Sequence, residues 1–181
     1  STYPMIGNYG IAAYHQESNK VQVSGFVVRQ FCPEPSHVES SSNIDSFLRE
    51  NDTTAISEVD TRSIARHIRA KGVMMGVITP TPNTKKMLNL LESFPKYDQV
   101  DFVKSVSTKS IYDWNESLRS EKNSSKNFKI FVSDFGLKYN ILRILQTKGC
   151  DIHVFPSHAT ADELLARDPD GILLSPGPGD P

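Results

Sequence analysis

The residues best placed to do chemistry stand at the end of the chain, where an apolar run gives way to alternating proline and glycine. Residues 172–174 are Ile-Leu-Leu, and Ser-Pro-Gly-Pro-Gly-Asp-Pro follows at 175–181. Prolines fix φ and donate no N–H, whereas glycines leave the backbone bare. Free N–H groups at the end of a buried strand can stabilise negative charge that develops on a substrate. The loop is therefore a candidate binding site, although a rigid turn after a core strand explains the same residues.

Nucleotide binding does not fit this loop. It lacks the Lys-Ser/Thr ending of a P-loop and the G-x-G-x-x-G spacing of a dinucleotide site, and Asp180 stands where an anion would bind. Asp134-Phe135-Gly136 matches a kinase triplet, but the other kinase motifs do not accompany it. We therefore treat that match as accidental.

The side chains that commonly act as nucleophiles or metal ligands form no recognisable set. Cys32 precedes a proline in a turn, and Cys150 begins a strand, so both are expected to be structural. The histidines show no metal-ligand spacing; they are His15, His37, His67, His153 and His158. No metal site is predicted. Lys138 is either a solvated lysine or a cation that faces the site.

The elements that must position the loop are a regular series of strands and helices in the last third of the chain. The pattern predicts strands over 128–133, 151–155 and 172–175, with helices over 140–148 and 161–166 between them. Such spacing favours parallel strands joined by right-handed crossovers. With a strand order of 2-1-3, the loops at 134–136 and 177–179 are neighbours at the carboxyl edge. Three strands are few for a doubly wound sheet, which usually has about five or more, so this domain is predicted to be incomplete.

The first part of the chain predicts a mixed α+β unit. We expect strands over 21–29 and 73–79, and helices over 42–50, from Asp60 to Gly72, and over 84–93. Residues 116–127 are polar and have no helical stripe, which is typical of a linker. The predicted domains are therefore residues 1–115 and 128–181.

Composition excludes several classes of protein. The 181 residues are 38% hydrophobic, with 20 Lys and Arg against 21 Asp and Glu, so neither nucleic acid nor a membrane is an expected partner. Two widely separated cysteines favour a reducing compartment, which predicts a cytoplasmic location without excluding an organelle. The first residue is not Met and the last lies in a loop, so we expect a cut through a longer protein.

Four segments, in order and spread over nearly the whole chain, together resemble one family. They are residues 2–10 (TYPMIGNYG), 59–62 (VDTR), 134–143 (DFGLKYNILR) and 170–181 (DGILLSPGPGDP). The set resembles the small, glutamine-hydrolysing chain of carbamoyl-phosphate synthase, which contains a class I glutamine amidotransferase domain. The resemblance implies an α/β fold: a mixed α+β N-terminal domain, then the start of a doubly wound parallel-sheet amidotransferase domain.

The resemblance also implies a function. In the family, a cysteine activated by a His and a Glu hydrolyses glutamine. The ammonia passes to a large chain, which uses ATP, Mg and bicarbonate to make carbamoyl phosphate. Carbamoyl phosphate then supplies arginine or pyrimidine biosynthesis. Residues 1–115 would help to dock that large chain. Gly177 and Gly179 would bind glutamine, with Gly177 as the oxyanion-hole candidate, and Lys138 would lie near the ammonia exit.

The departures from the family bear on activity. In the family, the catalytic cysteine and the His/Glu pair follow the glycine loop, so no catalytic residue is predicted in this span, and no cofactor either. A family serine that binds glutamine lies before the segment matched by residue 1, and Pro176 replaces a frequent asparagine. These 181 residues are predicted to be inactive alone, whereas a longer protein would hydrolyse glutamine. The alternative is a non-catalytic α/β module that binds a partner or metabolite.

Overall fold

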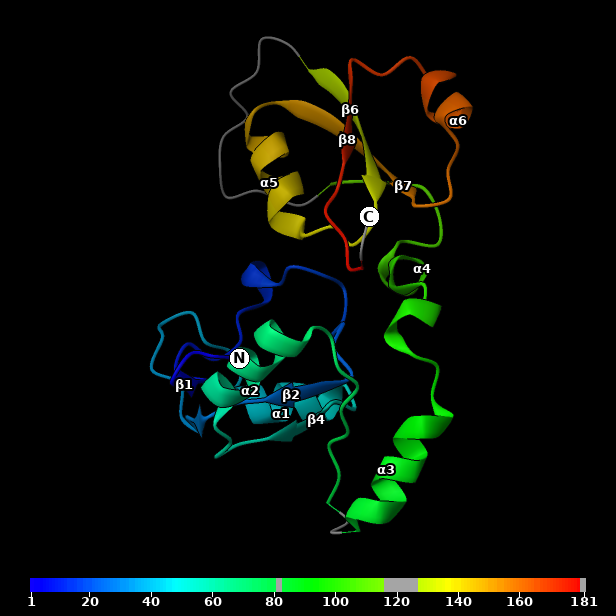
Figure 1. The fold of residues 1–181 in the computed structure, drawn as a ribbon. Helices are drawn as coiled ribbons and strands as arrows, with labels where there is room; N and C mark the ends of the chain where they lie inside the picture. Colours follow the sequence, from blue (N-terminus) through cyan, green and yellow to red (C-terminus); the bar gives the residue numbers. More distant parts are fainter. Residues whose placement is uncertain (81–82, 116–126, 180–181) are drawn as a thin grey trace. The chain divides into compact units, whose positions relative to one another are not determined.

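The computed structural model describes residues 1–80, 83–115 and 127–179 (Figure 1). The chain forms two compact units, Ser1–Val100 and Asp101–Pro181, and each is described by itself below. None of the described helices has the length and apolar character needed to cross a bilayer.

The second unit is built on a four-stranded sheet with the order β5-β7-β6-β8. Its strands are β5 (Tyr112–Asp113), β6 (Phe128–Asp134), β7 (Cys150–Pro156) and β8 (Gly171–Leu174). β6 is parallel to both β7 and β8, so the three predicted strands lie in the order 2-1-3, the order for which the two loops were expected to be neighbours. The first and third of these strands therefore end side by side at the carboxyl edge of the sheet.

The two faces of this sheet have separate apolar cores. Successive strand residues point to opposite faces. On one face, Val132 packs with Leu142 of α5 (Tyr139–Thr147). On the other, Phe131 packs with Phe155 and with Leu164 of α6 (Ala161–Leu165). Helices therefore cover both faces, as the predicted doubly wound fold requires (Figure 1).

The prediction of only three strands is wrong, because β5 adds a fourth. β5 is antiparallel to β7, with Tyr112 opposite Val154, and the Trp114 N–H donates to the Ile152 carbonyl at 3.0 Å. Together with α4 (Phe102–Val106), this stretch belongs to the second compact unit, which begins at Asp101 rather than after the predicted linker. Most of that linker, 116–126, lies outside the described residues, and the domain bounds at 115 and 128 stay a prediction.

The first unit combines short strand pairs with helices. β1 (Met5–Ile6) is parallel to β3 (Gln30–Phe31), and β2 (Gly25–Val27) is parallel to β4 (Thr54–Ile56). The α-helices are α1 (Ile44–Glu50), α2 (Thr61–Lys71) and α3 (Thr84–Ser93), and the 3-10 turns are η1 (Ala13–His15) and η2 (Tyr97–Gln99). Val28 and Leu48 are the buried apolar side chains of this unit's described part.

The predicted limits of α2 are confirmed. The Asp60 side chain accepts the Ser63 N–H at 3.0 Å and so caps the first turn. Gly72 ends the helix with φ at 86°, a conformation that a residue without Cβ adopts at little cost.

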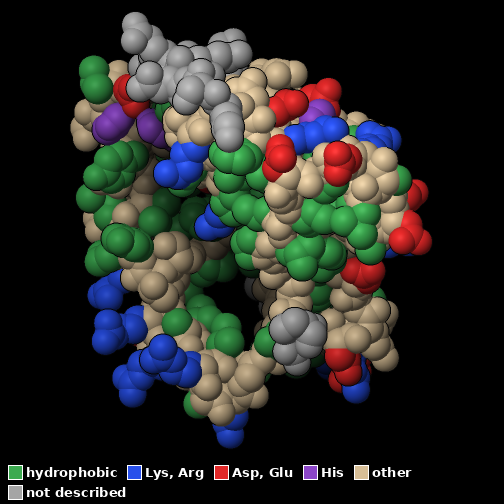
Figure 2. Space-filling model, turned by 90° about the horizontal axis from the view of Figure 1, so that it is seen from above, with side chains coloured by type: hydrophobic (Ala, Val, Ile, Leu, Met, Phe, Trp, Pro, Cys, Tyr) green, Lys and Arg blue, Asp and Glu red, His purple; other side chains and the backbone are tan. Residues whose placement is uncertain are grey.

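The predicted strand over 73–79 is wrong. The β-branched composition suggested a strand, but no neighbouring strand pairs with this segment in the described part of the chain. Residues 73–77 instead lie exposed, with Val73 60% and Met74 52% accessible. Apolar side chains reach the surface elsewhere too: Figure 2 shows green side chains on the visible face, and Leu174 of β8 is 69% exposed.

Candidate functional site

The candidate site lies where the loops after β6 and β8 meet. Because these parallel strands are neighbours, both loops leave the same edge of the sheet. A Cβ atom built on Gly136 would lie 3.2 Å from the Gly177 Cα and 3.1 Å from the Pro178 Cδ. A Cβ atom on Gly177 would overlap the Phe135 carbonyl oxygen. Glycine at position 177 therefore permits a contact between the two backbones that no other residue allows.

The Asp134 carboxylate holds the first loop in place. Its Oδ1 atom accepts the N–H groups of Gly136 at 3.0 Å and Leu137 at 2.8 Å, and its Oδ2 atom accepts that of Thr108 at 2.8 Å. The residue is 6% exposed, so these bonds replace water that the charged group has lost. One buried carboxylate thus fixes the turn after β6 and ties it to the segment between α4 and β5.

Ser175 joins the second loop to the first. Its Oγ atom accepts the Phe135 N–H at 2.9 Å and donates to the Pro176 carbonyl at 3.0 Å. Its own N–H donates to the Ser133 carbonyl at 3.1 Å, which extends the pairing of β8 with β6 by one residue. The serine is 7% exposed, so the link lies beneath the glycine loop.

These bonds leave two amides of the glycine loop available. The N–H groups of Phe135, Gly136 and Leu137 are all satisfied by Ser175 or Asp134. Within the described residues, no acceptor contacts the N–H of Gly177 or of Gly179, and both glycines are exposed. Gly179 also has φ at 107°, which glycine adopts readily. The site therefore offers unpaired donors on a fixed backbone, as an oxyanion-binding loop requires.

The phenol of Tyr112 in β5 interacts electrostatically with Asp134, the residue that holds the first loop. Burial raises the pKa of its phenol, and the nearby Tyr139 and the negative charge of Asp134 add to the rise. The phenol therefore stays protonated at neutral pH and adds no negative charge to the site.

Lys138 follows the same loop and is the N-cap residue of α5. It is exposed, and its carbonyl accepts the Ile141 N–H at 3.0 Å, while its side chain makes no capping bond. The lysine therefore lies at the edge where the sequence predicted it, but its suggested role in ammonia exit stays a prediction.

Neither cysteine is placed to act at this loop. Cys150 pairs with Phe128 at the amino ends of β7 and β6, six residues from the carboxyl edge, or about 20 Å at 3.3 Å per residue. Cys32 belongs to the first unit, where its thiol donates to the Glu34 carbonyl at 3.3 Å. The structure thus gives no reason to revise their predicted structural roles.

The histidines do not gather into a metal site. Across the described ranges, no three His, Cys, Asp or Glu side chains could hold a metal ion together. His153 Nδ1 lies 2.6 Å from Asp113 Oδ1 across the β5–β7 pair. Its Nε2 atom lies 3.4 Å from Asp151 Oδ2, but the geometry is not that of a hydrogen bond. His153 therefore fastens the edge strand to the sheet.

Comparison with known proteins matches the two ends of the chain to two domain families. Residues 1–78 match the carbamoyl-phosphate synthase small chain, CPSase domain, and residues 131–181 match the class I glutamine amidotransferase family. The second match contains both loops of the candidate site, but not Thr108 or Tyr112.

Relatives of the complete chain agree with these matches. Carbamoyl phosphate synthase small chains from Syntrophotalea carbinolica, Stutzerimonas stutzeri and Salmonella typhimurium are 37%, 38% and 36% identical, each over 99% of this chain. The chain is thus similar along its whole length to carbamoyl-phosphate synthase small chains. It spans about half the length of these relatives, because the alignment covers 50% of each of them.

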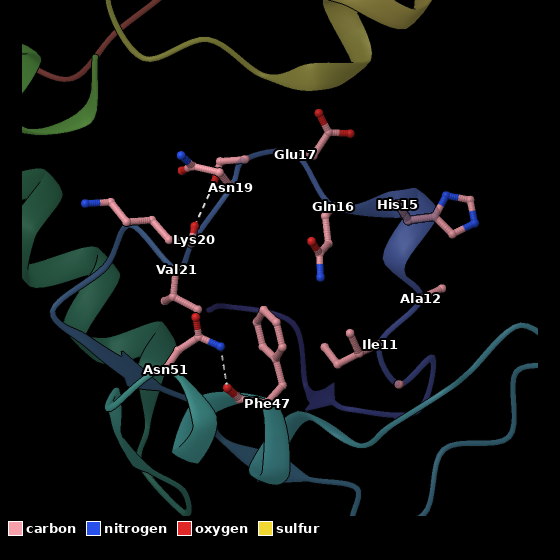
Figure 3. A pocket seen from close by; sticks show the side chains of 12 residues that line it. Ile11, Ala12, His15, Gln16, Glu17, Asn19, Lys20, Val21, Phe47 and Asn51 are labelled. Atoms are coloured by element: carbon pink, nitrogen blue, oxygen red, sulfur yellow. Dashed lines mark hydrogen bonds between the residues drawn. The ribbon is translucent and has the colours of Figure 1, made fainter. Parts of the chain in front are cut away.

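The first unit has a hollow of about 470 Å³ between residues 10–21 and α1 (Figure 3). The Phe47 ring and the Ile11 side chain line its inner wall, whereas Glu17 and His15 point away from it in Figure 3. His15 instead contacts Glu39 at 2.8 Å. The inner wall of the hollow is therefore partly apolar.

Proposed function

We propose that this chain is part of the glutamine-hydrolysing subunit of a carbamoyl-phosphate synthase, and that its glycine loop binds glutamine. The observation that carries the proposal is the pair of unpaired N–H groups, those of Gly177 and Gly179, on a backbone fixed by Asp134 and Ser175. In this proposal the Gly177 N–H donates to the carbonyl oxygen of the glutamine side chain and stabilises the oxyanion that forms when a nucleophile attacks.

The nucleophile in this proposal is a cysteine outside these residues, assisted by a His and a Glu. Attack of the thiolate on the side-chain amide releases ammonia and leaves a thioester, which water then converts to glutamate and free enzyme. Neither Cys32 nor Cys150 supplies the thiol in this proposal, because Cys150 lies at the opposite end of its strand from the loop and the Cys32 thiol donates to the Glu34 carbonyl at 3.3 Å. The 181 residues alone are therefore expected not to hydrolyse glutamine.

The released ammonia is proposed to pass to a separate or fused large synthetase chain. That chain would use ATP, Mg and bicarbonate to make carbamoyl phosphate, for arginine or pyrimidine biosynthesis in the cytoplasm. The cofactors therefore belong to the partner and not to this chain. Lys138, exposed beside the loop, would lie near the path along which ammonia leaves.

Glutamine hydrolysis by the longer protein that contains this chain tests the proposal. We expect glutamate release by that protein, a thioester adduct seen by mass spectrometry of the quenched reaction, and neither signal from residues 1–181. If the longer protein releases no glutamate and forms no thioester, the proposal is wrong. Activity of residues 1–181 alone would show that the catalytic thiol lies within them.

A further inference from the structure

Helix α2 carries a line of arginines on one face. Arg62, Arg66 and Arg69 are spaced i, i+4 and i+7, which places them on the same side of the helix over about 10 Å. All three are exposed. We call these three residues the arginine stripe.

The stripe lies beside, and not on, the part of α2 that packs on its own unit. Thr61 is 6% exposed and Ala65 is half-buried. Ile64 and Ile68 flank them on the same side, at 44% and 41% exposed. At 100° per residue, the centre of this apolar side lies about a third of a turn from the centre of the stripe, and Arg69 is the arginine nearest to it, about 40° from Ala65. Packing of the helix therefore does not require the arginines.

The arginine stripe also lowers the stability of helix α2 itself. Arg62 and Arg66 are like charges at i,i+4, and Arg66 and Arg69 are like charges at i,i+3, and both spacings destabilise a helix. Arg62 lies in the first turn, where the helix dipole disfavours a cation, whereas Arg69 in the last turn is favoured. The helix dipole therefore explains Arg69 but not the other two.

No acidic side chain of the described residues neutralises the stripe. α2 contains no Asp or Glu, and the ion pairs of the described part lie elsewhere, such as Arg49 with Asp45. The nearest acid in sequence, Asp60, already accepts the N–H and hydroxyl of Ser63 at 3.0 and 2.7 Å. These bonds lower the pKa of Asp60, so its charge is committed to the helix cap.

We propose that the arginine stripe is a docking surface for a partner protein that presents carboxylates along about 10 Å. The inference rests on the proposed function, in which the synthetase chain is the partner. Arginine binds carboxylates through two parallel hydrogen bonds and is enriched among the residues that dominate interface energies. A protein is favoured over nucleic acid because the chain's net charge is −1, with no general basic excess.

Charge reversal in the longer protein, with the synthetase chain as the binding probe, tests the stripe. The variant Arg62→Glu/Arg66→Glu/Arg69→Glu is compared with Lys71→Glu/Lys85→Glu/Lys86→Glu, which makes the same change in net charge at other exposed positions. We expect the stripe variant to raise the Kd about 100-fold at low salt and the control to change it less than about threefold. The loss should shrink as salt increases, because exposed charges are screened.

Four results would overturn the proposal. The first is equal binding by the stripe variant and the wild type. The second is a loss of several degrees in Tm for the stripe variant alone, which would show that the arginines pair within the chain. The third is loss of binding to a 30-bp DNA duplex while synthetase binding persists. The fourth is a wild type that does not bind the synthetase. Glutamine hydrolysis, measured without the partner, is expected to be unchanged and tests the proposed function separately.

Discussion

The carbonyl oxygen of Phe135 lies where the Cβ atom of any larger residue at position 177 would have to stand. This contact brings the loop after β8 against the loop after β6, below the exposed amide of Gly177. The Asp134 carboxylate accepts the Gly136 N–H and the Ser175 hydroxyl accepts the Phe135 N–H, and these bonds fix the two backbones. The position of the amide is therefore set by packing before any ligand arrives, which is the arrangement that makes a backbone donor effective.

Replacing Gly177 with alanine is expected to destabilise the second unit and to misplace the loop. The added methyl overlaps the Phe135 carbonyl, and overpacking of this kind costs about 1–3 kcal/mol. Urea denaturation followed by circular dichroism measures the loss. Gly76→Ala is the control, since its Cβ would meet nothing within 4 Å and should change stability by less than about 0.5 kcal/mol. Equal stability of both variants would contradict the packing described for Gly177.

Replacing Asp134 with asparagine should cost about 2 kcal/mol, since bonds to a charged acceptor contribute about 1.5–3 kcal/mol. An amide has one accepting oxygen, so its NH₂ group must face either the Thr108 N–H or those of Gly136 and Leu137. Urea denaturation of the purified chain gives the difference.

The matched control for this change is Asp170→Asn. Asp170 also accepts a backbone N–H, that of Lys129 at 2.7 Å, but it does so at an exposed position. We expect Asp170→Asn to lose clearly less unfolding free energy than Asp134→Asn, because water can replace the bond at Asp170. If Asp134→Asn loses no more unfolding free energy than Asp170→Asn, the three hydrogen bonds of the Asp134 carboxylate do not fix the loop.

Helix α6 should lose stability in acid through Glu163. The Glu163 carboxylate accepts the Thr160 N–H at 2.8 Å, and this bond chiefly lowers the pKa of the carboxyl below its ordinary value. Because the pKa of Glu163 is lower in the folded state than in the unfolded state, its carboxylate stabilises the fold. This stabilisation is complete above the pKa of the unfolded state, about 4.3, and is lost as the pH falls through the pKa of the folded state.

A comparison of urea midpoints at pH 7 and pH 3 measures this effect. At pH 7 the wild type should have a higher urea midpoint than Glu163→Gln. At pH 3 the difference between the two midpoints should be smaller. Asp162→Asn serves as the control, since the Asp162 carboxylate accepts no hydrogen bond within the described residues. A Glu163→Gln difference that widens in acid would reverse the sign assigned to the capping bond.

Removing both cysteines should leave glutamine hydrolysis by the longer protein within about twofold of the wild type. Cys150 lies at the amino edge of the sheet, and the Cys32 thiol is bonded to the Glu34 carbonyl, so neither is offered to the glycine loop. The variant Cys32→Ser/Cys150→Ser, assayed for glutamate release, gives the answer. Complete loss of glutamate release by a variant with unchanged Tm would place the nucleophile at one of these positions.

The sequence predicted those elements whose ends or periodicity are marked by strong local signals. Asp60 and Gly72 delimit α2 by capping and by a positive φ, both of which depend on local residues alone. The alternation of apolar strands and helices predicted the parallel pairing of β6, β7 and β8, whereas the order β7-β6-β8 entered only as an assumption that the structure bears out. The glycine loop could be found for the same reason, because its glycines and prolines define a turn whatever surrounds it.

Features that depend on distant partners were missed or wrong. β5 has only two residues and exists because β7 lies beside it, whereas residues 73–79 have strand-like side chains but pair with no strand in the described chain. The three bonds of Asp134 were also missed. An aspartate two residues before a glycine is a signal for a side-chain-to-backbone turn. The bond from the Thr108 N–H, 26 residues away, has no such signal.

The single tryptophan of the chain, Trp114, belongs to the second unit, where its indole N–H donates to Gln146 at 2.9 Å and its ring centroid lies 4.9 Å from that of Tyr139. Emission excited at 295 nm therefore arises from one half of the molecule, whereas far-ultraviolet signals average over both. A melting curve recorded by this emission describes the second unit alone, and a mismatch between the two optical probes is the expected signature of two units that unfold separately.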